Sequence, residues 1–181
     1  KRQRPVIHCR EPGGTPVAED IRSIHCHGQG THGEVVTQDT RVLLMNASRR
    51  QHVEHVIKPA LARGDIVVCE RFNWSTWVYV EGSSRTLAET LHTTMFGDMV
   101  PDCTIYLDID AQTARERIAR RNELDDLEVG LSSRFEEMRE AFQGLVEQPL
   151  LPAPRHVFQV DGTQDRDTVF ENIVQCVAKA M

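Results

Sequence analysis

The chain has 181 residues, enough for one domain with a full-sized hydrophobic core. Hydrophobic residues make up 40% and charged residues 27% of the chain, which is ordinary for a globular protein. The net charge of −6 argues against a surface that binds nucleic acid or membranes non-specifically, because both need clustered positive charge. It does not exclude an anionic small substrate, whose site needs only a few local arginines.

The chain has no features of secretion or membrane insertion. No apolar run approaches the roughly 20 residues that a membrane span needs, and no signal-peptide pattern follows Lys1. The cysteines are scattered, odd in number and mostly placed in apolar runs, as is usual for small buried side chains in a reducing compartment. They are Cys9, Cys26, Cys69, Cys103 and Cys176. We therefore expect a cytoplasmic protein with no membrane or nucleic-acid partner.

The first third of the chain predicts a strand followed by helices. A short apolar stretch over 5–9 predicts a buried strand, and Thr15 is of the type that caps a helix N-terminus. The polar, Gly-rich segment 25–33 predicts a connection. A helical pattern then runs over 37–62, and Pro59 should kink or divide it.

The rest of the chain continues to alternate predicted strands with predicted helices. Residues 66–69 form a continuous apolar run, typical of a parallel strand covered on both faces. The acidic segment within 119–133 predicts a mobile lid. The other predicted strands are 103–109 and 157–160, and the other predicted helices are 74–79, 87–96, 111–121, 134–148 and 166–180. The pattern predicts an α/β fold, a parallel sheet with helices on both faces, in a single domain over 1–181.

Arginines occur where a parallel sheet places its ligands, at the carboxyl ends of strands. Arg10 follows the first predicted strand, Arg71 follows the second, and Arg117 and Arg121 end the helix after the third. A guanidinium group suits planar, bidentate recognition of phosphate oxygens. One such arginine would more often only solvate a helix end, but several together predict a phosphate site.

Longer strings then resemble the bacterial thymidylate kinases. The string Arg-Glu-Pro-Gly-Gly-Thr-Pro at 10–16 resembles the loop after their second strand, and 49–61 resembles their long third helix. Residues 70–79 resemble their Asp-Arg segment, 101–125 the run into the lid, and 160–164 the closing strand and turn. Five strings in the same order imply a P-loop fold of the nucleoside-monophosphate kinase type.

The resemblance implies an enzyme that transfers the γ-phosphoryl group of ATP, with Mg²⁺, to dTMP. We expect a homodimer that supplies dTDP for nucleotide biosynthesis. The alternatives are a broader deoxynucleoside-monophosphate kinase, a deoxynucleoside kinase, and a non-catalytic protein that keeps only the nucleotide pocket. The strings at 10–15 and 58–61 favour the monophosphate enzyme over the nucleoside enzyme.

The resemblance also implies a role for each residue of the substrate site. Arg49 should reach a thymine carbonyl, Thr76 should contact the base edge, and Arg71 should hold the dTMP phosphate. Tyr79 should lie on the deoxyribose and exclude a 2′-hydroxyl, and Met45 should cover the base where the family usually has Phe. The other implied substrate-binding residues are Arg10, Glu11, Pro12, Glu70, Phe72 and Ser75.

Catalysis should depend on neutralising the charge of the transferring phosphoryl group. The resemblance assigns this to Arg71 together with Arg117 and Arg121, the last two facing the phosphoryl group as the lid closes. The implied ATP-binding residues are Arg117, Arg121, Gly162, Thr163 and Gln164.

Several positions depart from the family pattern. Glu70 replaces the Asp that usually precedes the arginine, and Phe72 replaces Tyr or His. In the lid, Asp125 is followed by Asp126 where Arg is common, so we expect no catalytic contribution from that position.

A phosphate-binding loop of the form Gly-x-x-x-x-Gly-Lys-Ser/Thr does not occur in the 181 residues. The glycines Gly28, Gly30 and Gly33 have no Lys and no strand before them. We therefore expect an N-terminally incomplete kinase that lacks a first strand, loop and helix of roughly 25 to 35 residues. The isolated 181 residues should be inactive.

No metal held by protein side chains is expected. His25, Cys26, His27 and His32 lie close in sequence, but a polar surface loop explains them better than a metal site with defined ligand spacing. Cys69 lies next to the predicted site, where a buried structural thiol is a better explanation than a nucleophile.

Overall fold

The computed structural model has an α/β architecture in which the four described strands form two parallel pairs, as predicted. It has two compact units, residues 1–96 and 97–181, here called unit 1 and unit 2. The single domain expected from the sequence stays a prediction. The structure describes residues 4–27, 34–80, 82–119, 134–150 and 152–181.

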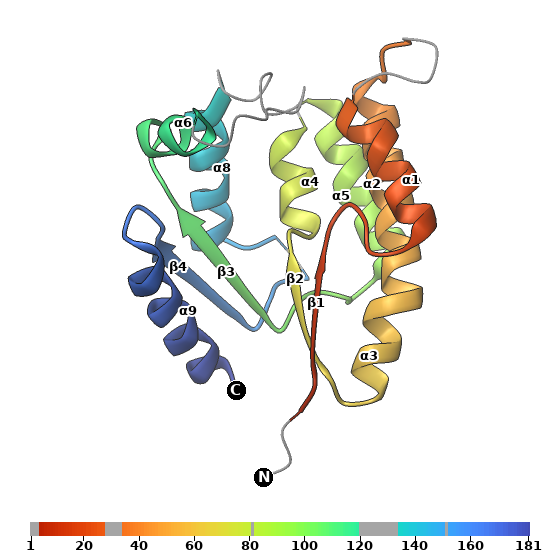
Figure 1. The fold of residues 1–181 in the computed structure, drawn as a ribbon. Coiled ribbons are helices and arrows are strands. Elements are labelled where there is room, and N and C mark those ends of the chain that lie inside the picture. The colour runs from red at the N-terminus through yellow and green to blue at the C-terminus, as the bar shows by residue number, and fades with distance from the viewer. Residues whose placement is uncertain (1–3, 28–33, 81, 120–133, 151) are drawn as a thin grey trace. The chain divides into compact units, whose positions relative to one another are not determined.

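The sheet of unit 1 is a pair of parallel strands, β1 (Val6–Arg10) and β2 (Ile66–Glu70) (Figure 1). The register pairs Cys9 with Cys69 and Arg10 with Glu70. Both strands confirm the predicted ones. Their carboxyl ends lie side by side, so the loops that follow them can share one site.

Helix α1 (Pro16–His27) follows the loop after β1. The hydroxyl of Thr15 accepts a hydrogen bond from the backbone N–H of Ala18 at 3.2 Å, which confirms the predicted cap. The prediction of a connection from residue 25 was wrong for its first residues, because the helix continues through His27.

The long helical pattern is divided, as Pro59 predicted. It consists of α2 (Gln38–His52), a π-helical turn η1 (Val53–Ile57) and α3 (Lys58–Ala62). Lys58 N–H donates to the carbonyl of Val53, five residues earlier, as in a π-helix. The next residue, Pro59, has no N–H to donate to the preceding turn. The register change therefore lies just before the proline.

Two further helices complete unit 1, namely α4 (Asn73–Tyr79) and α5 (Ser83–Phe96). Helix α1 packs along α2, and α2 packs along α5 (Figure 1). The buried apolar side chains of the unit include Ala18, Val42, Met45, Val53, Ile57, Trp74, Trp77 and Ala88.

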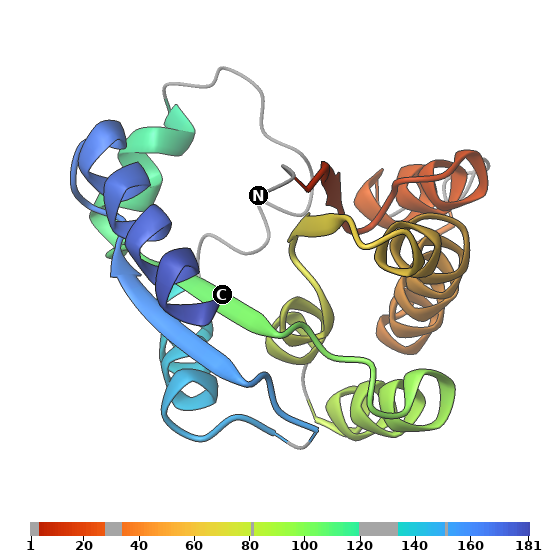
Figure 2. The ribbon, with the colours of Figure 1, turned by 90° about the horizontal axis from the view of Figure 1, so that it is seen from below.

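Unit 2 has a second parallel pair, β3 (Cys103–Asp108) and β4 (His156–Asp161). Helices α8 (Phe135–Glu147) and α9 (Arg166–Ala180) cover opposite faces of this pair (Figure 2). Helix α6 (Ala111–Ala119) follows β3. These elements also confirm the predicted ones, while Arg120, Arg121 and the rest of the predicted lid to residue 133 lie outside the described residues.

The strands are less buried than predicted. Val6, Val68 and Leu107 are 59%, 49% and 46% exposed, so neither pair is covered completely on both faces. The expectation that the cysteines are buried holds only for Cys9, and the other four are partly exposed. Within the described part of the chain, every helix is too short or too polar to cross a membrane.

Candidate functional site

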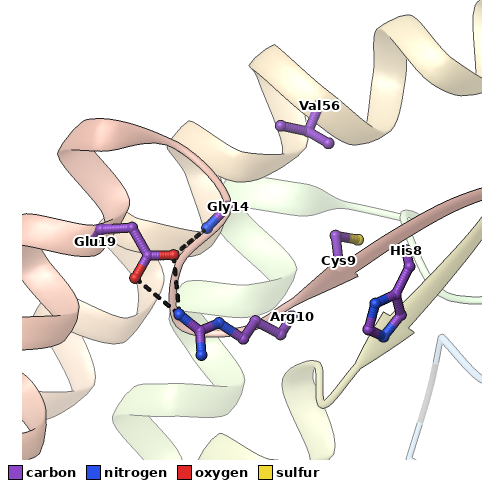
Figure 3. Close-up of a pocket in the computed structure, with 6 residues that line it drawn as sticks. All are labelled: His8, Cys9, Arg10, Gly14, Glu19 and Val56. Carbon is purple, nitrogen blue, oxygen red and sulfur yellow. Dashed lines mark hydrogen bonds and ion pairs between the residues drawn. The ribbon is translucent and has the colours of Figure 1, made fainter.

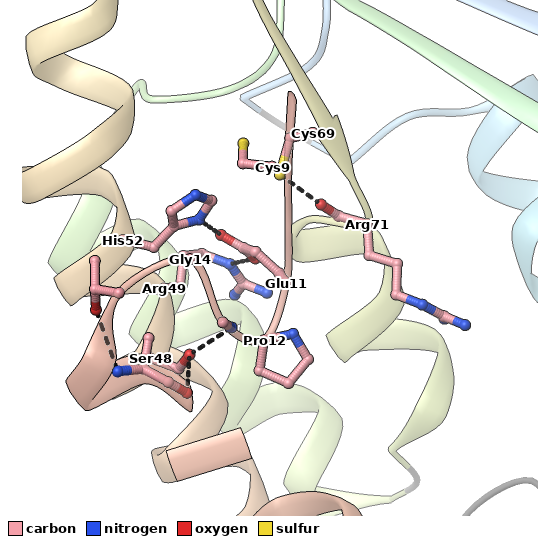
Figure 4. Close-up of polar contacts among 12 residues, drawn as sticks. Cys9, Glu11, Pro12, Gly14, Ser48, Arg49, His52, Cys69 and Arg71 are labelled. Atoms are coloured by element: carbon pink, nitrogen blue, oxygen red, sulfur yellow. Dashed lines mark hydrogen bonds and ion pairs between the residues drawn. The ribbon is translucent and has the colours of Figure 1, made fainter. Parts of the chain in front are cut away.

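A buried carboxylate organises the loop after β1. Glu11 N–H donates to the Glu70 carbonyl at 2.9 Å, which ties the loop to the end of β2. The Glu11 side chain is buried, and its Oε2 accepts a hydrogen bond from Arg49 Nε at 2.7 Å. Its other oxygen, Oε1, lies 3.4 Å from His52 Nδ1. Helix α2 supplies both partners because residues three apart share one face of a helix (Figure 4).

The guanidinium group of Arg49 joins three elements. It bonds to Glu11 through Nε, and its Nη2 donates to Thr76 Oγ1 of α4 at 2.8 Å. Its carbon lies 5.1 Å from the centre of the Phe72 ring, a cation–π arrangement. The structure thus brings together Arg49 and Thr76, two of the residues predicted to contact the base. The contact of either one with a thymine stays a prediction.

Arg71 and Tyr79 form a second pair. Arg71 follows β2 with φ of 65°, a left-handed conformation that is strained for any residue other than glycine. Its Nη1 donates to the Tyr79 hydroxyl, and its guanidinium carbon lies 5.3 Å from the centre of the Tyr79 ring. Both side chains predicted for the phosphate and sugar therefore meet beside the end of β2. Such strained residues often occur at functional sites.

Arg10 and Glu70 are held by partners on the protein. Arg10 Nη2 donates to Glu19 Oε2 at 3.1 Å, and His8 Nε2 lies 2.7 Å from Glu70 Oε1. Glu19 also accepts a hydrogen bond from Gly14 N–H at 3.0 Å, and this bond lowers the pKa of the carboxyl. The contacts of Arg10 and Glu70 with substrate stay predictions.

Glycines are required where the loop after β1 approaches other groups. A Cβ on Gly13 would lie 2.4 Å from Glu19 Oε1, and one on Gly14 would lie 2.6 Å from His52 Cδ2. Both glycines also have positive φ, which other residues rarely adopt. A pocket of about 280 Å³ opens beside this loop, lined by His8, Cys9, Arg10, Gly14, Glu19 and Val56 (Figure 3).

The other predicted substrate residues of unit 1 lie on the same elements. Met45 is buried on α2, Ser75 is buried on α4, and Pro12 is buried in the loop after β1. The Pro12 carbonyl accepts a hydrogen bond from Arg22 Nη1 at 3.0 Å. The predicted set therefore comes from three segments of one unit.

In unit 2, two of the predicted ATP-binding residues are in contact. Arg117 Nη2 donates to the Gln164 carbonyl at 3.4 Å. Gly162 N–H donates to the Asp108 carbonyl at 2.8 Å, and a Cβ there would lie 2.8 Å from Ile109 Cγ2. Thr163 donates to Asp161 through both its N–H and its hydroxyl. Arg121 lies outside the described residues.

Asp108 ends β3 as the acceptor of a dense hydrogen-bond network that the sequence did not indicate. Arg139 donates to both of its oxygens, at 2.7 and 3.0 Å. Gln143, Gln159 and Tyr106 donate at 3.3, 3.1 and 3.2 Å. The bonds from Arg139 come first among the causes that hold the pKa of this carboxyl below its usual value. The network fixes α8 to the carboxyl end of β3.

Sequence reasoning missed a cluster beside Glu11. It placed Cys69 next to the site but not His52 or Cys9, and the potential ligand atoms of these three residues lie within 4.8 Å of one another. Interaction with Cys69, and to a smaller extent with His52, lowers the pKa of Cys9 to about 5, although burial acts in the opposite direction. The pKa of Cys69 is raised, first by its interaction with Cys9 and then by burial. Burial alone lowers the pKa of His52, but Cys9 and Glu11 raise it to about 9. The spacing of His52 three residues after Arg49 was the available signal.

Comparison with known proteins places the chain among nucleotide kinases. A family model described as thymidylate kinase matches residues 1–173. A thymidylate kinase of Cupriavidus pinatubonensis is 38% identical over 168 residues, covering 91% of this chain and 77% of that relative. One of Pseudomonas fluorescens is 36% identical, covering 94% of this chain and 82% of that relative.

A solved structure has a similar fold. The crystal structure of thymidylate kinase from Ehrlichia chaffeensis matches with a TM-score of 0.66, covering 96% of this chain and 80% of that one. The identity is 24%, so this likeness concerns the fold.

Proposed function

The chain belongs to the thymidylate kinase family, which transfers a phosphoryl group from ATP to dTMP to form dTDP, and we propose that unit 1 holds the dTMP. The observation that carries the proposal is the chain of contacts from Glu11 through Arg49 to Thr76. These residues come from three segments that are far apart in sequence. A deoxynucleoside kinase is not favoured, because the family model and both relatives describe the monophosphate enzyme.

Recognition of the base follows from the chemistry of Arg49. A guanidinium group carries only donors, and thymine presents carbonyl acceptors on the edge where cytosine carries an amino donor. Glu11 and Thr76 hold the guanidinium in one orientation before any nucleotide binds, which lowers the entropy lost on binding. The site should therefore prefer dTMP to dCMP.

Recognition of the phosphate is assigned to Arg71. Its side chain is exposed at the carboxyl end of β2, where ligands of parallel sheets bind. Tyr79 orients the guanidinium group by accepting its hydrogen bond. Arg71 would position the acceptor phosphate and neutralise charge in the transition state, which is most of what phosphoryl transfer requires.

The phosphoryl donor is ATP, and we propose that it arrives as its Mg²⁺ complex. Arg117 and the turn at Gly162, Thr163 and Gln164 are proposed to contact it from unit 2. The contact between Arg117 and Gln164 supports their acting together. The homodimer and the cytoplasmic location stay predictions that sedimentation and cell fractionation can test.

Calorimetry with three ligands tests the proposal. We expect dTMP to bind at least about tenfold more tightly than dCMP, a difference of about 1.4 kcal/mol. Thymidine should bind more weakly than dTMP because it offers Arg71 no phosphate. Equal affinity for dTMP and dCMP would refute base recognition by Arg49, and equal affinity for dTMP and thymidine would refute the role of Arg71.

A further inference from the structure

Beside the carboxyl halves of β1 and β2 lies a cluster of cysteine and histidine side chains, which are common metal ligands and which the kinase reaction does not use. Cys9 and Cys69 are register partners on the two parallel strands, so their side chains leave the same face of the sheet. His52 of α2 lies beside them, and its ring faces the Cys9 sulfur (Figure 4). The two Sγ atoms and a ring nitrogen lie within 4.8 Å of one another.

The unused nitrogen of His52 points to a ligand. The side chain is fully buried, yet among the described residues its Nε2 meets no hydrogen-bond partner of normal geometry. A buried polar atom without a partner has lost its hydrogen bonds to water without replacement, so such atoms are rare in folded proteins. A metal ion is a partner that would use this atom together with the two thiolates.

The other nitrogen of His52 is already held as a metal-ligating histidine requires. Its Nδ1 lies 3.4 Å from Glu11 Oε1, in a carboxylate–histidine arrangement. Metal-binding histidines nearly always pair their second nitrogen in this way, which fixes the ring and raises its basicity.

We propose that Cys9, Cys69 and His52 form a Zn²⁺ site with three protein ligands. Thiolate and imidazole donors select Zn²⁺ over Mg²⁺ or Ca²⁺, which prefer oxygen. Around a tetrahedral zinc ion, sulfur and nitrogen ligands are roughly 3.5–3.8 Å apart, so small side-chain rotations bring these donors into place. On binding, the ion replaces the proton on Nε2 and the protons of any protonated thiols, which leave to solvent.

The neighbouring pocket supplies access. Its lining includes Cys9, one of the three donors, and Gly14 (Figure 3). Gly14 lies against the His52 ring, where a Cβ would be 2.6 Å from His52 Cδ2. A water molecule from this pocket would be the fourth ligand. Because Glu11 binds both His52 and Arg49, an ion here would also stiffen the support of Arg49.

Metal titration of the reduced chain tests the site. We expect one equivalent of Co²⁺ to bind with a thiolate-to-cobalt charge-transfer absorption, and Zn²⁺ to displace it. Cys9→Ser and Cys69→Ser should each lower Zn²⁺ affinity by more than the roughly 10–100-fold that loss of an outer-shell partner costs. Cys103→Ser, in a strand of unit 2, is the matched control and should bind as the parent does.

A second measurement needs no substitution. Zn²⁺ should protect Cys9 and Cys69 from alkylation while leaving Cys103 and Cys176 reactive, as peptide mass spectrometry can show. Absence of the charge-transfer band, equal loss in the Cys103→Ser control, or no protection of Cys9 and Cys69 would each overturn the proposal. All of these measurements are made without nucleotide, so their failure leaves the proposed function untouched.

Discussion

Nε of Arg49 lies 2.7 Å from Oε2 of Glu11, and each of the two side chains is only 1% exposed. The pair joins the loop after β1 to helix α2. A buried ion pair contributes little net stability compared with an apolar pair, but removal of one partner leaves an uncompensated charge. Arg49 therefore depends on Glu11 for its position and for its burial.

Glu11→Gln should destabilise the chain by about 3–5 kcal/mol, because Arg49 then loses its counter-charge. Arg49→Met should have a similar cost, and the double variant should cost less than the two single changes together. The free energy of unfolding of unit 1 can be measured by urea unfolding, with the fluorescence of Trp74 and Trp77, the two tryptophans of the chain, as the signal. Glu89→Gln, which breaks the exposed pair with Arg85, is the control and should cost at most about 1 kcal/mol. Strict additivity would contradict the coupling.

Arg71→Ala should weaken dTMP binding by about 1.5–3 kcal/mol, the contribution of a charged hydrogen bond. Arg71→Gly should weaken dTMP binding to the same extent. The Arg71→Gly variant should be at least as stable as the Arg71→Ala variant, because glycine accepts the φ of 65° without strain. Calorimetry and urea unfolding measure the two effects. Arg85→Ala, on an exposed face of α5, should bind dTMP as the parent does. An unchanged affinity in Arg71→Ala would remove Arg71 from the phosphate site.

Tyr79 combines two contributions that two substitutions can separate. Tyr79→Phe removes the acceptor for Arg71 but keeps the ring, so dTMP should bind more weakly while the preference over the ribonucleotide persists. Tyr79→Ala should also narrow that preference, because the ring no longer excludes a 2′-hydroxyl. Paired titrations with dTMP and its ribonucleotide counterpart give both quantities. A preference that is unchanged in Tyr79→Ala would make Tyr79 a packing residue only.

His92 should make stability depend on pH. Its side chain is buried against Trp77 and Phe96, and burial, followed by the nearby charge of Arg49, lowers the pKa of His92 to about 4. An unfolded histidine has a pKa of about 6.5, so the unfolded chain binds the extra proton between about pH 6.5 and pH 4. Stability should fall through that interval as the pH is lowered, by at most about 3 kcal/mol from this residue.

Urea unfolding at several pH values tests the role of His92. His92→Gln cannot titrate, so its stability should vary less between pH 6.5 and pH 4 than that of the parent. His55→Gln, an exposed change on the π-helical turn, should keep the slope of the parent. Parallel curves for the parent and His92→Gln would contradict the effect.

Local sequence signals predicted most of the elements. Apolar runs placed all four described strands, Thr15 marked the start of α1, and Pro59 marked the division of the long helix. The end of α1 was missed because His25 to His27 are polar and precede glycines, which favours a connection, although the helix continues. The predicted substrate residues came from resemblance, and the structure brings Glu11, Arg49, Phe72 and Thr76 into contact.

Relationships that depend on tertiary packing could not be predicted. Glu11 and Arg49 are 38 residues apart, and their pairing depends on how α2 packs against the loop after β1. The proximity of Cys9 and Cys69 depends on the register of two parallel strands, which neither strand specifies by itself. His52, the last residue of α2 and 43 residues along the chain from Cys9, joins them through the packing of that helix.

Titration of dTMP into Thr76→Val and Thr76→Ser tests the central claim, that unit 1 recognises dTMP through an Arg49 oriented by Glu11 and Thr76. Valine keeps the shape of threonine but removes the acceptor for Arg49 Nη2, whereas serine keeps the hydroxyl. We predict roughly tenfold weaker dTMP binding and a smaller preference over dCMP in Thr76→Val, with Thr76→Ser close to the parent. If Thr76→Val instead binds dTMP as tightly as the parent and keeps its preference over dCMP, the contact between Arg49 and Thr76 is not part of nucleotide recognition.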